Sequence, residues 1–546
     1  MNEPEFDFVI VGAGSAGCAV AERLSRNGRF RILLLEAGGE ANHPWIPVPL
    51  GVGRLLADPS VLWAFETEPE PEMKGQKLYW PRGRVLGGSS SINGMLFVRG
   101  DPLAYDRWRD LGCPGWGYQD VLPVFKRIED RPGGDKAYRG VGGPIAVTDI
   151  AHKDAITEAF FNGCQSYGIE PTEDYNAKSY EGVSYLQMSI ANGRRCSAET
   201  GYLRKARGRG NLSVMTRALV KRVVFDGSRA VGVEYHPLDH HGRPDTGVFA
   251  GCRYEVILCG GALCSPLILE RSGVGDQSIL ERRGIRTVRH LPGVGCNLQD
   301  HLNVRITYET MLRITLNDAL NSKLRGAMQM LRYLLTKRGL MATSTVTVHA
   351  IARSRVDITS PDIKLQLAHV TGRDRFSMAK GLGVDGFSGF SLNYFKLYPA
   401  SRGSVHVRSR DPLDDPVIKA NYLHDERDRQ DIVRGLHILR ELARQPAISR
   451  LIVREVLPGA DAQSDQELLE YARSTGQTSW HTVGSCKMGR DSESVVDSDL
   501  RVHDLDGLRV ADTSVIPIMV SSNINAAAYL VGERCADFLL SRWAAE

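Results

Sequence analysis

The stretch between residues 6 and 36 constrains the fold of this chain more than any other. Residues 6–11 (FDFVIV) form an apolar run of strand length, and three glycines follow at once in the spacing GxGxxG: Gly12, Gly14 and Gly17. Residues 16–26 place apolar side chains at helical offsets, and a second apolar strand, 32–35, ends at Glu36. The pattern predicts a strand–helix–strand unit whose glycines allow a tight turn and close approach of the backbone to a pyrophosphate.

The same unit predicts a dinucleotide-binding site. Free N–H groups and the helix dipole at the start of residues 16–26 favour a diphosphate. Glu36 lies 19 residues beyond Gly17, where its carboxylate can accept hydrogen bonds from ribose hydroxyls. A glycine-rich loop without a ligand would leave Glu36 unexplained. The motif alone distinguishes neither NAD from FAD nor one reaction from another.

Length and composition limit the class of protein. The 546 residues are too many for one core, so two or more domains are expected. Hydrophobic residues at 42% and charged residues at 24% are typical of soluble globular proteins. The net charge of +4 gives no electrostatic argument for a nucleic-acid partner, and none is predicted. The ten cysteines are scattered without a CxxC motif, which favours free thiols in a reducing compartment.

Targeting signals are also absent from the printed sequence. The N-terminal residues MNEPEFDF lack a hydrophobic signal core, and no run approaches the ~18–20 apolar residues of a transmembrane helix. We therefore expect a cytoplasmic protein. Residues 317–338 form a basic amphipathic segment that can lie on a membrane. We favour an ordinary helix on a domain surface, and peripheral contact with the inner membrane face stays open, as does the oligomeric state.

Later segments have local patterns of their own. We expect an extended, proline-rich covering segment at 42–81, a hairpin over 211–235 with its turn at Asp226 and Gly227, half-buried strands at 363–367 and 390–398, and helices at 425–446, 465–473 and 526–540. Residues 261–275 predict a helix with Ser265 as N-cap, Pro266 in the first turn and Gly273 past the end. The glycine- and serine-rich run 82–100 suits a backbone wrapped around a flat ligand with polar edges.

Longer blocks of sequence resemble one family. The chain is similar to the glucose–methanol–choline (GMC) family of FAD-dependent oxidoreductases, with residues 83–100 as its first signature and 261–275 as its second. Four further blocks agree: PGVGCNLQDHL at 292–302, YPASRGSVHVRSRDP at 398–412, WHTVGSCKMG at 480–489 and LRVADTSVIPIMVSSNIN at 508–525. The resemblance runs from about residue 6 to 540, and 60–125 are most similar to the choline-dehydrogenase-like bacterial branch, whose substrates are mixed.

The resemblance implies an α/β fold (α+β overall), with a Rossmann-like FAD-binding domain and a discontinuous substrate domain built on an antiparallel sheet. The FAD-binding domain is predicted to take residues 1–155, 195–305 and 476–546, the last part carrying the catalytic pair. The substrate domain takes 156–194 and 306–475.

Oxidation of an alcohol by a flavin needs a base for the hydroxyl proton, and neutral imidazole suits that task near neutral pH. Sequence physics does not choose among the 14 histidines. The resemblance chooses His481, and it places the second catalytic residue at Asn525, 44 positions later. Asn525 would donate its amide N–H to the substrate oxygen. We prefer it to the neighbouring Asn523, and either asparagine can also cap the following helix.

The resemblance also implies a set of FAD contacts. These are Gly12, Gly14, Ser15, Ala16, Gly17, Glu36 and Ala37 at the adenosine and diphosphate end, the backbone of Val220 at the adenine, Arg84, Gly88, Asn93, Gly94, Met95 and Leu96 along the diphosphate, ribityl chain and ring, and Trp480, Asp512 and Ala526 from the C-terminal part. Arg84 is alternatively a structural ion-pair residue. No metal site is predicted. Some relatives tether FAD through a histidine where this chain has Ile92, so non-covalent FAD is expected.

The sequence is compatible with three functions. The favoured one is oxidation of an alcohol to an aldehyde or ketone by hydride transfer to flavin N5, with oxygen or a quinone or other carrier as acceptor. The alternatives are an FAD-containing lyase of the same family, which does not turn over electrons, and an NAD-dependent dehydrogenase. The alcohol is not identified. No acidic residue can be assigned to a cationic substrate, and Glu270, where an apolar residue is usual, has no explanation from sequence.

Overall fold

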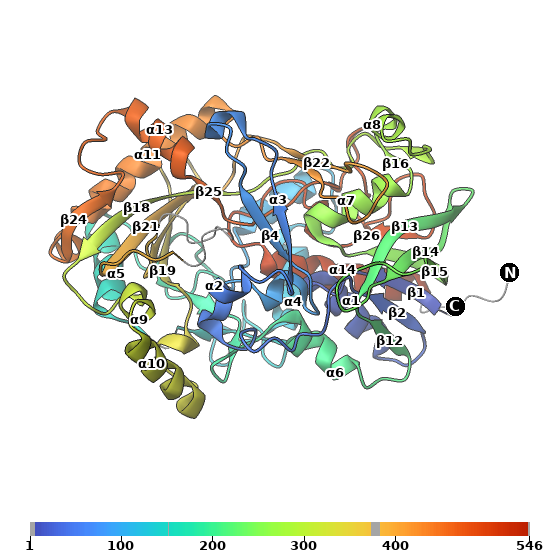
Figure 1. Cartoon of the computed structure of the whole chain (residues 1–546), viewed down its shortest axis with the longest axis horizontal. Coiled ribbons are helices and arrows are strands. Elements are labelled where there is room, and N and C mark those ends of the chain that lie inside the picture. The colour runs from blue at the N-terminus through green and yellow to red at the C-terminus, as the bar shows by residue number, and fades with distance from the viewer. Residues whose placement is uncertain (1–5, 151, 373–382, 544–546) are drawn as a thin grey trace.

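The chain folds into two lobes, each built on its own sheet (Figure 1). The computed structural model describes residues 6–150, 152–372 and 383–543. The nucleotide lobe, on the right of Figure 1, contains the predicted N-terminal unit, and the roof lobe, on the left, contains the antiparallel sheet. Both sheets take strands from distant parts of the chain. Among the described helices, none combines the length and apolar character needed to cross a bilayer.

The sheet of the nucleotide lobe has a parallel centre and an antiparallel edge. Its strand order is β12–β2–β1–β15–β14–β13, with β26 added on β15. The strands are β1 (Phe6–Val11), β2 (Ile32–Leu35), β12 (Leu212–Met215), β13 (Ala218–Asp226), β14 (Arg229–Pro237), β15 (Val248–Leu258) and β26 (Leu508–Val510). The central strands are buried on both faces, which explains their continuous apolar sequences. The predicted strand–helix–strand unit and the hairpin turn at Gly227 (φ +59°) are both confirmed.

Two helices pack tightly beneath the dinucleotide motif. Helix α1 (Ser15–Ser25) starts at the glycine turn, and α14 (Asn525–Trp543) lies against it. A Cβ at Gly532 would stand 2.5 Å from the carbonyl oxygen of Ala16, so glycine permits the close approach. This packing brings the C-terminal part of the chain to the N-terminal turn, and the helix predicted at 526–540 is confirmed.

The roof sheet is antiparallel, with the order β24–β18–β21–β20–β19–β8 and β25 added on β18. Its strands are β8 (Gly182–Tyr185), β18 (Leu302–Thr310), β19 (Val346–Ala352), β20 (Ile363–Ala368), β21 (Gly389–Lys396), β24 (Ile452–Leu457) and β25 (Gln477–Thr478). Helices α11 (Glu426–Ala443) and α5 (Ala155–Ser166) pack on it. The strands β20 and β21 are buried nearly throughout rather than half-buried, because the other face of the sheet closes over a cavity.

Helix α7 (Gly261–Arg271) begins four residues before the predicted N-cap. Ser265 and Pro266 therefore lie inside the helix, so the prediction of its start was wrong. The Ser265 hydroxyl instead donates to Asp512 Oδ2 at 2.6 Å. Gly273, at φ +85°, follows the end of the helix as predicted.

The structure supplies the missing explanation for Glu270. Its buried carboxylate accepts hydrogen bonds from His406 Nδ1 and from the backbone N–H of Val407, each at 2.7 Å. The pair joins α7 to β22 (Ser404–His406). An apolar residue could not replace these two acceptors.

The remaining elements form the coverings and connections. The helices are α2 (Val52–Leu55), α3 (Pro102–Asp110), α4 (Tyr118–Ile128), α6 (Arg204–Ala206), α8 (Gln277–Arg282), α9 (Leu316–Leu320), α10 (Lys323–Thr336), α12 (Pro446–Ser449) and α13 (Asp465–Thr475). Further strands of three or more residues are β3 (Leu62–Glu66), β4 (Tyr79–Gly83) and β23 (Val417–Lys419). The covering segment predicted at 42–81 thus contains α2 and the β3–β4 hairpin, and the basic segment at 317–338 is split into α9 and α10.

Candidate active site

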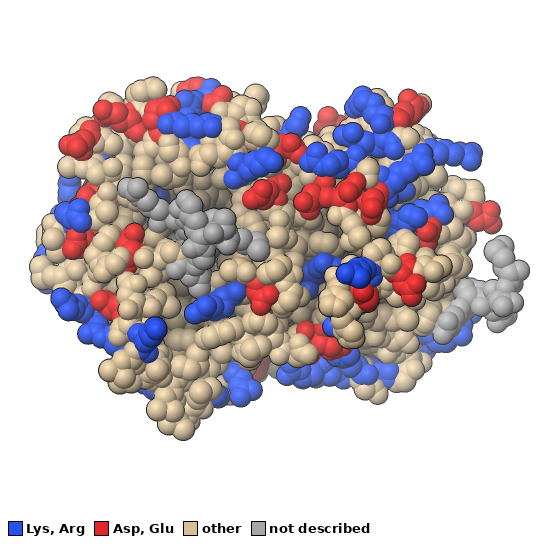
Figure 2. Space-filling model, viewed as in Figure 1, with Lys and Arg blue, Asp and Glu red and all other residues tan. Residues whose placement is uncertain are grey.

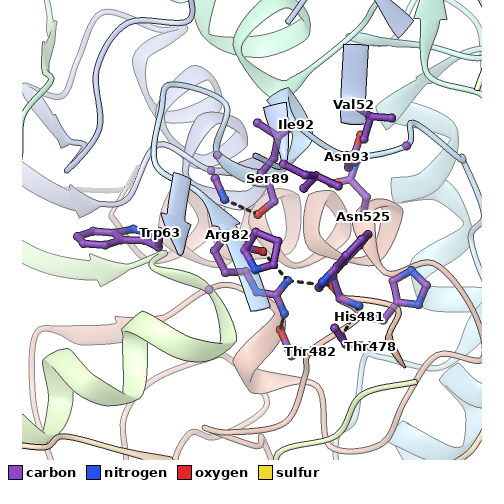
Figure 3. Close-up of a pocket in the computed structure, with 18 of the residues that line it drawn as sticks. Val52, Trp63, Arg82, Ser89, Ile92, Asn93, Thr478, His481, Thr482 and Asn525 are labelled. Atoms are coloured by element: carbon purple, nitrogen blue, oxygen red, sulfur yellow. Dashed lines mark hydrogen bonds between the residues drawn. The ribbon is translucent and has the colours of Figure 1, made fainter. Parts of the chain in front are cut away.

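A cavity of about 930 Å³ runs between the nucleotide lobe and the roof sheet. Figure 3 shows Arg82, His481 and Thr482 on one side of it and Ile92 and Asn93 on the other. The structure brings sixteen of the predicted residues to its wall: Gly12, Gly14, Ser15, Ala16, Glu36, Ala37, Gly88, Asn93, Gly94, Met95, Leu96, Val220, Trp480, His481, Asp512 and Asn525. Gly17, Arg84 and Ala526 are not part of the wall.

The end of the cavity near Glu36 is shaped by backbone. Glu36 accepts hydrogen bonds from the N–H groups of Ala13 at 2.9 Å and Gly38 at 2.8 Å. Burial raises the pKa of Glu36 to about 7, against the effect of these hydrogen bonds. A Cβ at Gly12 would stand 2.5 Å from a carbonyl oxygen, and one at Gly17 would stand 1.9 Å from another. Gly17 therefore serves the packing of turn and helix, and the space left beside the turn fits a dinucleotide.

The middle of the cavity is formed by the glycine–serine run, which packs on the same turn. A Cβ at Gly88 would stand 2.7 Å from Gly14 Cα, so the two loops touch through their backbones. Ser89 Oγ accepts from the N–H of Gly83 at 3.1 Å, as Figure 3 shows. Ile92 lines the cavity with an apolar side chain that offers no nucleophile. Arg84 lies outside the wall, with its guanidinium 4.3 Å from the Trp63 ring.

Hydrogen bonds at the other end of the cavity fix the tautomer of His481. His301 Nε2 contacts the carbonyl oxygen of Leu397 at 2.9 Å, and a carbonyl only accepts. His301 therefore carries its proton on Nε2 and accepts at Nδ1. His481 Nδ1 lies 3.0 Å from that atom and must donate to it. This arrangement leaves Nε2 of His481 unprotonated and able to accept a proton.

Asn523, and not Asn525, contacts this nitrogen. Asn523 Nδ2 lies 2.9 Å from His481 Nε2. The side chain of Asn525 accepts a hydrogen bond from Ser15 Oγ at 2.8 Å instead. Asn525 is the first residue of α14, so its side chain turns toward α1, whereas Asn523 precedes the helix. In this structure Asn523 is therefore the asparagine that contacts His481, and Asn525 lines the same cavity with its side chain bonded to Ser15.

A buried lysine completes the arrangement. Lys364, on β20, donates to Asn523 Oδ1 at 2.8 Å and to Ser522 Oγ at 3.0 Å. Because its oxygen faces the ammonium, the Asn523 amide must present its NH₂ group to His481. Burial lowers the pKa of Lys364 to about 7. The sequence does not reveal the role of Lys364, because a lysine in a strand carries no local signal for burial.

The electrostatic surroundings keep His481 neutral. Burial, followed by the nearby His301, Lys364 and Arg82, lowers the pKa of His481 well below its usual value. Asp300 accepts from the backbone N–H of His481 at 2.6 Å, and Arg82 donates to Thr482 Oγ1 at 2.7 Å (Figure 3). Arg82 was not among the predicted site residues, although it lies in the same RGR triplet as Arg84.

Apart from the cation Arg82, amide side chains and one aromatic ring line the wall around His481. It includes Asn303, Gln366, Asn393, Phe395 and Gln477. Gln366 Oε1 is buried without a hydrogen-bond partner in the part of the chain that the structure describes. The carboxylates among the described wall residues are Glu36, Asp414, Asp415 and Asp512, and none of these makes a hydrogen bond or ion pair with His481, Asn523 or Lys364. The arrangement can take a proton from a hydroxyl and hold the resulting oxygen.

Comparisons with known proteins find similar chains over nearly the whole length of this one. A family model described as GMC oxidoreductase matches residues 6–303, and a second with the same description matches 399–532. Oxygen-dependent choline dehydrogenases from Vibrio vulnificus and Brucella anthropi are 37% and 39% identical, over 99% and 98% of this chain and 95% and 96% of their own. The solved pyridoxine 4-oxidase from Mesorbium loti has a TM-score of 0.87 at 30% identity, covering 99% of this chain and all of its own. An Aspergillus oryzae formate oxidase variant shares the fold, with a TM-score of 0.90 at 24% identity over the whole of both chains.

Proposed function

Since the chain belongs to the GMC oxidoreductase family, and is an FAD-dependent enzyme that oxidises a CH–OH group, we propose that His481 is the base that removes the hydroxyl proton. The observation that carries this proposal is the position of His481 between His301 and Asn523, whose hydrogen bonds require Nε2 of His481 to be the unprotonated ring nitrogen. A base in this position contributes about 10²–10⁴-fold to the rate. Neutral imidazole is available because the pKa of His481 is lowered.

Asn523 is proposed to hold the substrate oxygen. Its Nδ2 group donates to Nε2 of His481. An alcohol oxygen placed between the two residues would accept this hydrogen bond while its own proton passes to His481 Nε2. The donor then stabilises charge that develops on the oxygen, an effect worth about 10²-fold or more for one preorganised donor. Bound FAD would accept the hydride from the carbon that bears this oxygen.

The residues around the cavity fit FAD without a covalent bond. Glu36 would accept from the ribose, and the Gly12–Gly17 turn and Gly88–Leu96 loop would hold the diphosphate and ribityl chain. The predicted cofactor contacts that line the cavity, including Val220, Trp480 and Asp512, remain part of this proposal. So do the domain boundaries after residues 155, 194, 305 and 475.

The substrate is proposed to be an uncharged alcohol with further hydrogen-bonding groups. The cavity wall near His481 is lined mainly by amides and one aromatic ring, its charged member there is the cation Arg82, and Gln366 Oε1 is available to accept a hydrogen bond from a substrate hydroxyl. A quaternary ammonium, as in the relatives named for choline, would find no free carboxylate there. The electron acceptor is proposed to be oxygen or a quinone, and the location cytoplasmic with contact at the inner membrane face.

Anaerobic bleaching of the yellow flavin by a panel of alcohols tests the proposal. Neutral aromatic and aliphatic alcohols should bleach it faster than choline. A parallel measurement with oxygen and with an artificial dye identifies the acceptor. Productive substrates that never bleach the flavin would support a lyase, which none of the comparisons favours. A colourless protein that reduces NAD would contradict the assignment.

A further inference from the structure

Helix α10 presents its apolar stripe to solvent. It projects with α9 at the lower left of Figure 1, and Tyr333 is its one buried residue. Leu324 is 72% exposed, Leu331 58% and Leu335 77%. With Met328 they form a continuous stripe at helical spacing, and Leu320 and Leu334 extend it. The segment forms a helix on the surface, as expected, and its apolar stripe faces solvent. A contiguous exposed apolar stripe is typical of an interaction surface.

The side of α10 opposite the stripe anchors the helix to the protein, and basic residues lie on either side of the stripe. On the opposite side, the hydroxyl of Tyr333 donates to the carbonyl oxygens of Pro47 at 3.3 Å and Gly193 at 3.1 Å. At ~100° per residue, Lys323, Arg325 and Arg332 lie about a quarter-turn to either side of the stripe. Lys337 and Arg338 follow the helix, which contains no acidic residue. In Figure 2 the end of this projection is tan.

The same pair of helices borders the cavity. The wall residues from α9 and α10 are Leu316, Ala319, Leu320, Lys323, Gly326, Ala327 and Met330. Leu320 belongs both to the wall and to the exposed surface, at 52% exposure. The apolar stripe therefore adjoins an edge of the cavity that contains His481.

We propose that α9 and α10 dock on an anionic lipid surface and bring this edge of the cavity against it. The stripe can enter the acyl boundary while the flanking cations meet anionic lipid headgroups. A second copy of the chain fits less well, because a two-fold contact would place these cations against their own equivalents. The docking proposal depends only on the features of α9 and α10. That a lipid-soluble alcohol or acceptor enters the cavity from the membrane depends in addition on the proposed function.

Vesicle co-sedimentation of the holoenzyme tests the docking. Vesicles of phosphatidylglycerol and phosphatidylcholine should bind the protein, and pure phosphatidylcholine should bind it much less. The double variant Leu324→Asp/Leu335→Asp should lose at least tenfold in affinity. A matched control, Val356→Asp at a site that is 99% exposed outside α10, should bind as the unchanged protein does. High salt should weaken binding, since it screens the cations.

Absence of binding to anionic vesicles would overturn the proposal. So would light scattering that shows a dimer converted to a monomer by the double variant, because a second copy would then occupy the stripe. Anaerobic flavin bleaching by a water-soluble alcohol separates the two proposals. It should be equal in the double variant and the unchanged enzyme, and its failure in both would contradict the proposed function while leaving the docking result intact.

An independent observation concerns Lys364. It is fully buried, and in the described ranges it has no salt bridge. Its Nζ lies 5.6 Å from the centre of the Phe395 ring in the cavity wall. We propose that Lys364 is a positioning residue that orients the Asn523 amide toward His481 and keeps a positive charge beside the imidazole. This inference deepens the proposed function and rests on it.

The pH dependence of flavin reduction distinguishes this role from a purely structural one. The titratable and charged groups around His481 are His301, Lys364, Arg82 and Asp300. Removing the Lys364 charge raises the pKa of His481, because a like charge is lost. Lys364→Met should therefore move the acid limb of the rate profile to higher pH and lower the plateau about tenfold.

A double variant and a matched control complete the test. Lys364→Met should add little to the loss caused by Asn523→Ala, since residues acting as a unit are not additive. Lys396→Met, which removes a lysine paired with Asp428 and Asp431, should leave the acid limb in place. A lowered plateau with an unmoved acid limb would overturn the role of the charge. An additive loss in the double variant would overturn the orientation of Asn523.

Discussion

The end of the cavity near Glu36 and the end near His481 are built from the chain in different ways. Glu36 and the glycine turn come from one short stretch, and backbone N–H groups supply the contacts of the carboxylate. At the other end, His481, Asn523 and Lys364 come from two loops and a roof strand that are far apart in sequence. The first end is therefore determined by local sequence, and the second by packing of the lobes. Binding and catalysis should accordingly be separable by substitution.

The largest effect is expected for His481→Ala. Loss of the base should lower the rate of anaerobic flavin reduction by about 10²–10⁴-fold. FAD content, measured by absorbance after gel filtration, should stay unchanged because the glycine turn is intact. A rate within a few-fold of the original would remove His481 as the base and with it the contrast between the two ends.

The two asparagines provide the next test. Asn523→Ala should slow flavin reduction by about 10²-fold, because its amide faces Nε2 of His481. Asn525→Ala removes the hydrogen bond from Ser15, and should lower the free energy of unfolding by about 1 kcal/mol with a much smaller effect on rate. The matched pair is compared by stopped-flow absorbance. Equal rate losses, or a larger one for Asn525→Ala, would restore the original prediction.

A smaller effect is expected at the opposite end of the cavity. Glu36→Gln should weaken FAD binding by about ten- to a hundredfold, since it removes charge-assisted hydrogen bonds of about 1.5–3 kcal/mol. Titration of the apoprotein with FAD measures this loss. Once loaded, the variant should be reduced by alcohol at the original rate. Slower reduction of the loaded variant would show that the two ends are coupled.

The smallest effect concerns stability away from the cavity. Burial lowers the pKa of His406, but Cys296 and Glu270 raise it overall to about 9. Because the pKa of His406 is higher in the folded than in the unfolded state, its protonation stabilises the folded state fully below about pH 6.5. This contribution is lost as the pH rises through about 9. Glu270→Gln should therefore lower the free energy of unfolding by about 1 kcal/mol at pH 6 and by less above pH 9. Urea unfolding measures both values, with exposed Glu493→Gln as the control. An equal loss at both pH values would contradict the charged pair.

Much of the fold was predictable because it depends on local pattern. Period-2 and apolar runs predicted β1, β2, β20 and β21, and helical offsets predicted α11, α13 and α14. Errors arose where tertiary contacts override local signals. Ser265, a good cap by type, lies inside α7 and bonds to Asp512. The burial of β20 and β21 on both faces follows from the lobe that covers them, and no alternation in sequence reports it.

The candidate site was predicted in part for the same reason. The sequence by itself determined the dinucleotide turn, the acceptor Glu36 and the position of His481 within a recognisable block, because each depends on residues close together in the chain. Only the tertiary structure decided that Asn523 contacts His481, that the apolar stripe of α10 faces solvent and that Lys364 lies beside Asn523. These three features depend on which side chains come into contact when the two lobes pack, and on how far each side chain is removed from solvent. The burial of a side chain and the electrostatic potential around it depend on all the residues that surround it. Folding decides which residues these are, and many of them lie far away in the sequence.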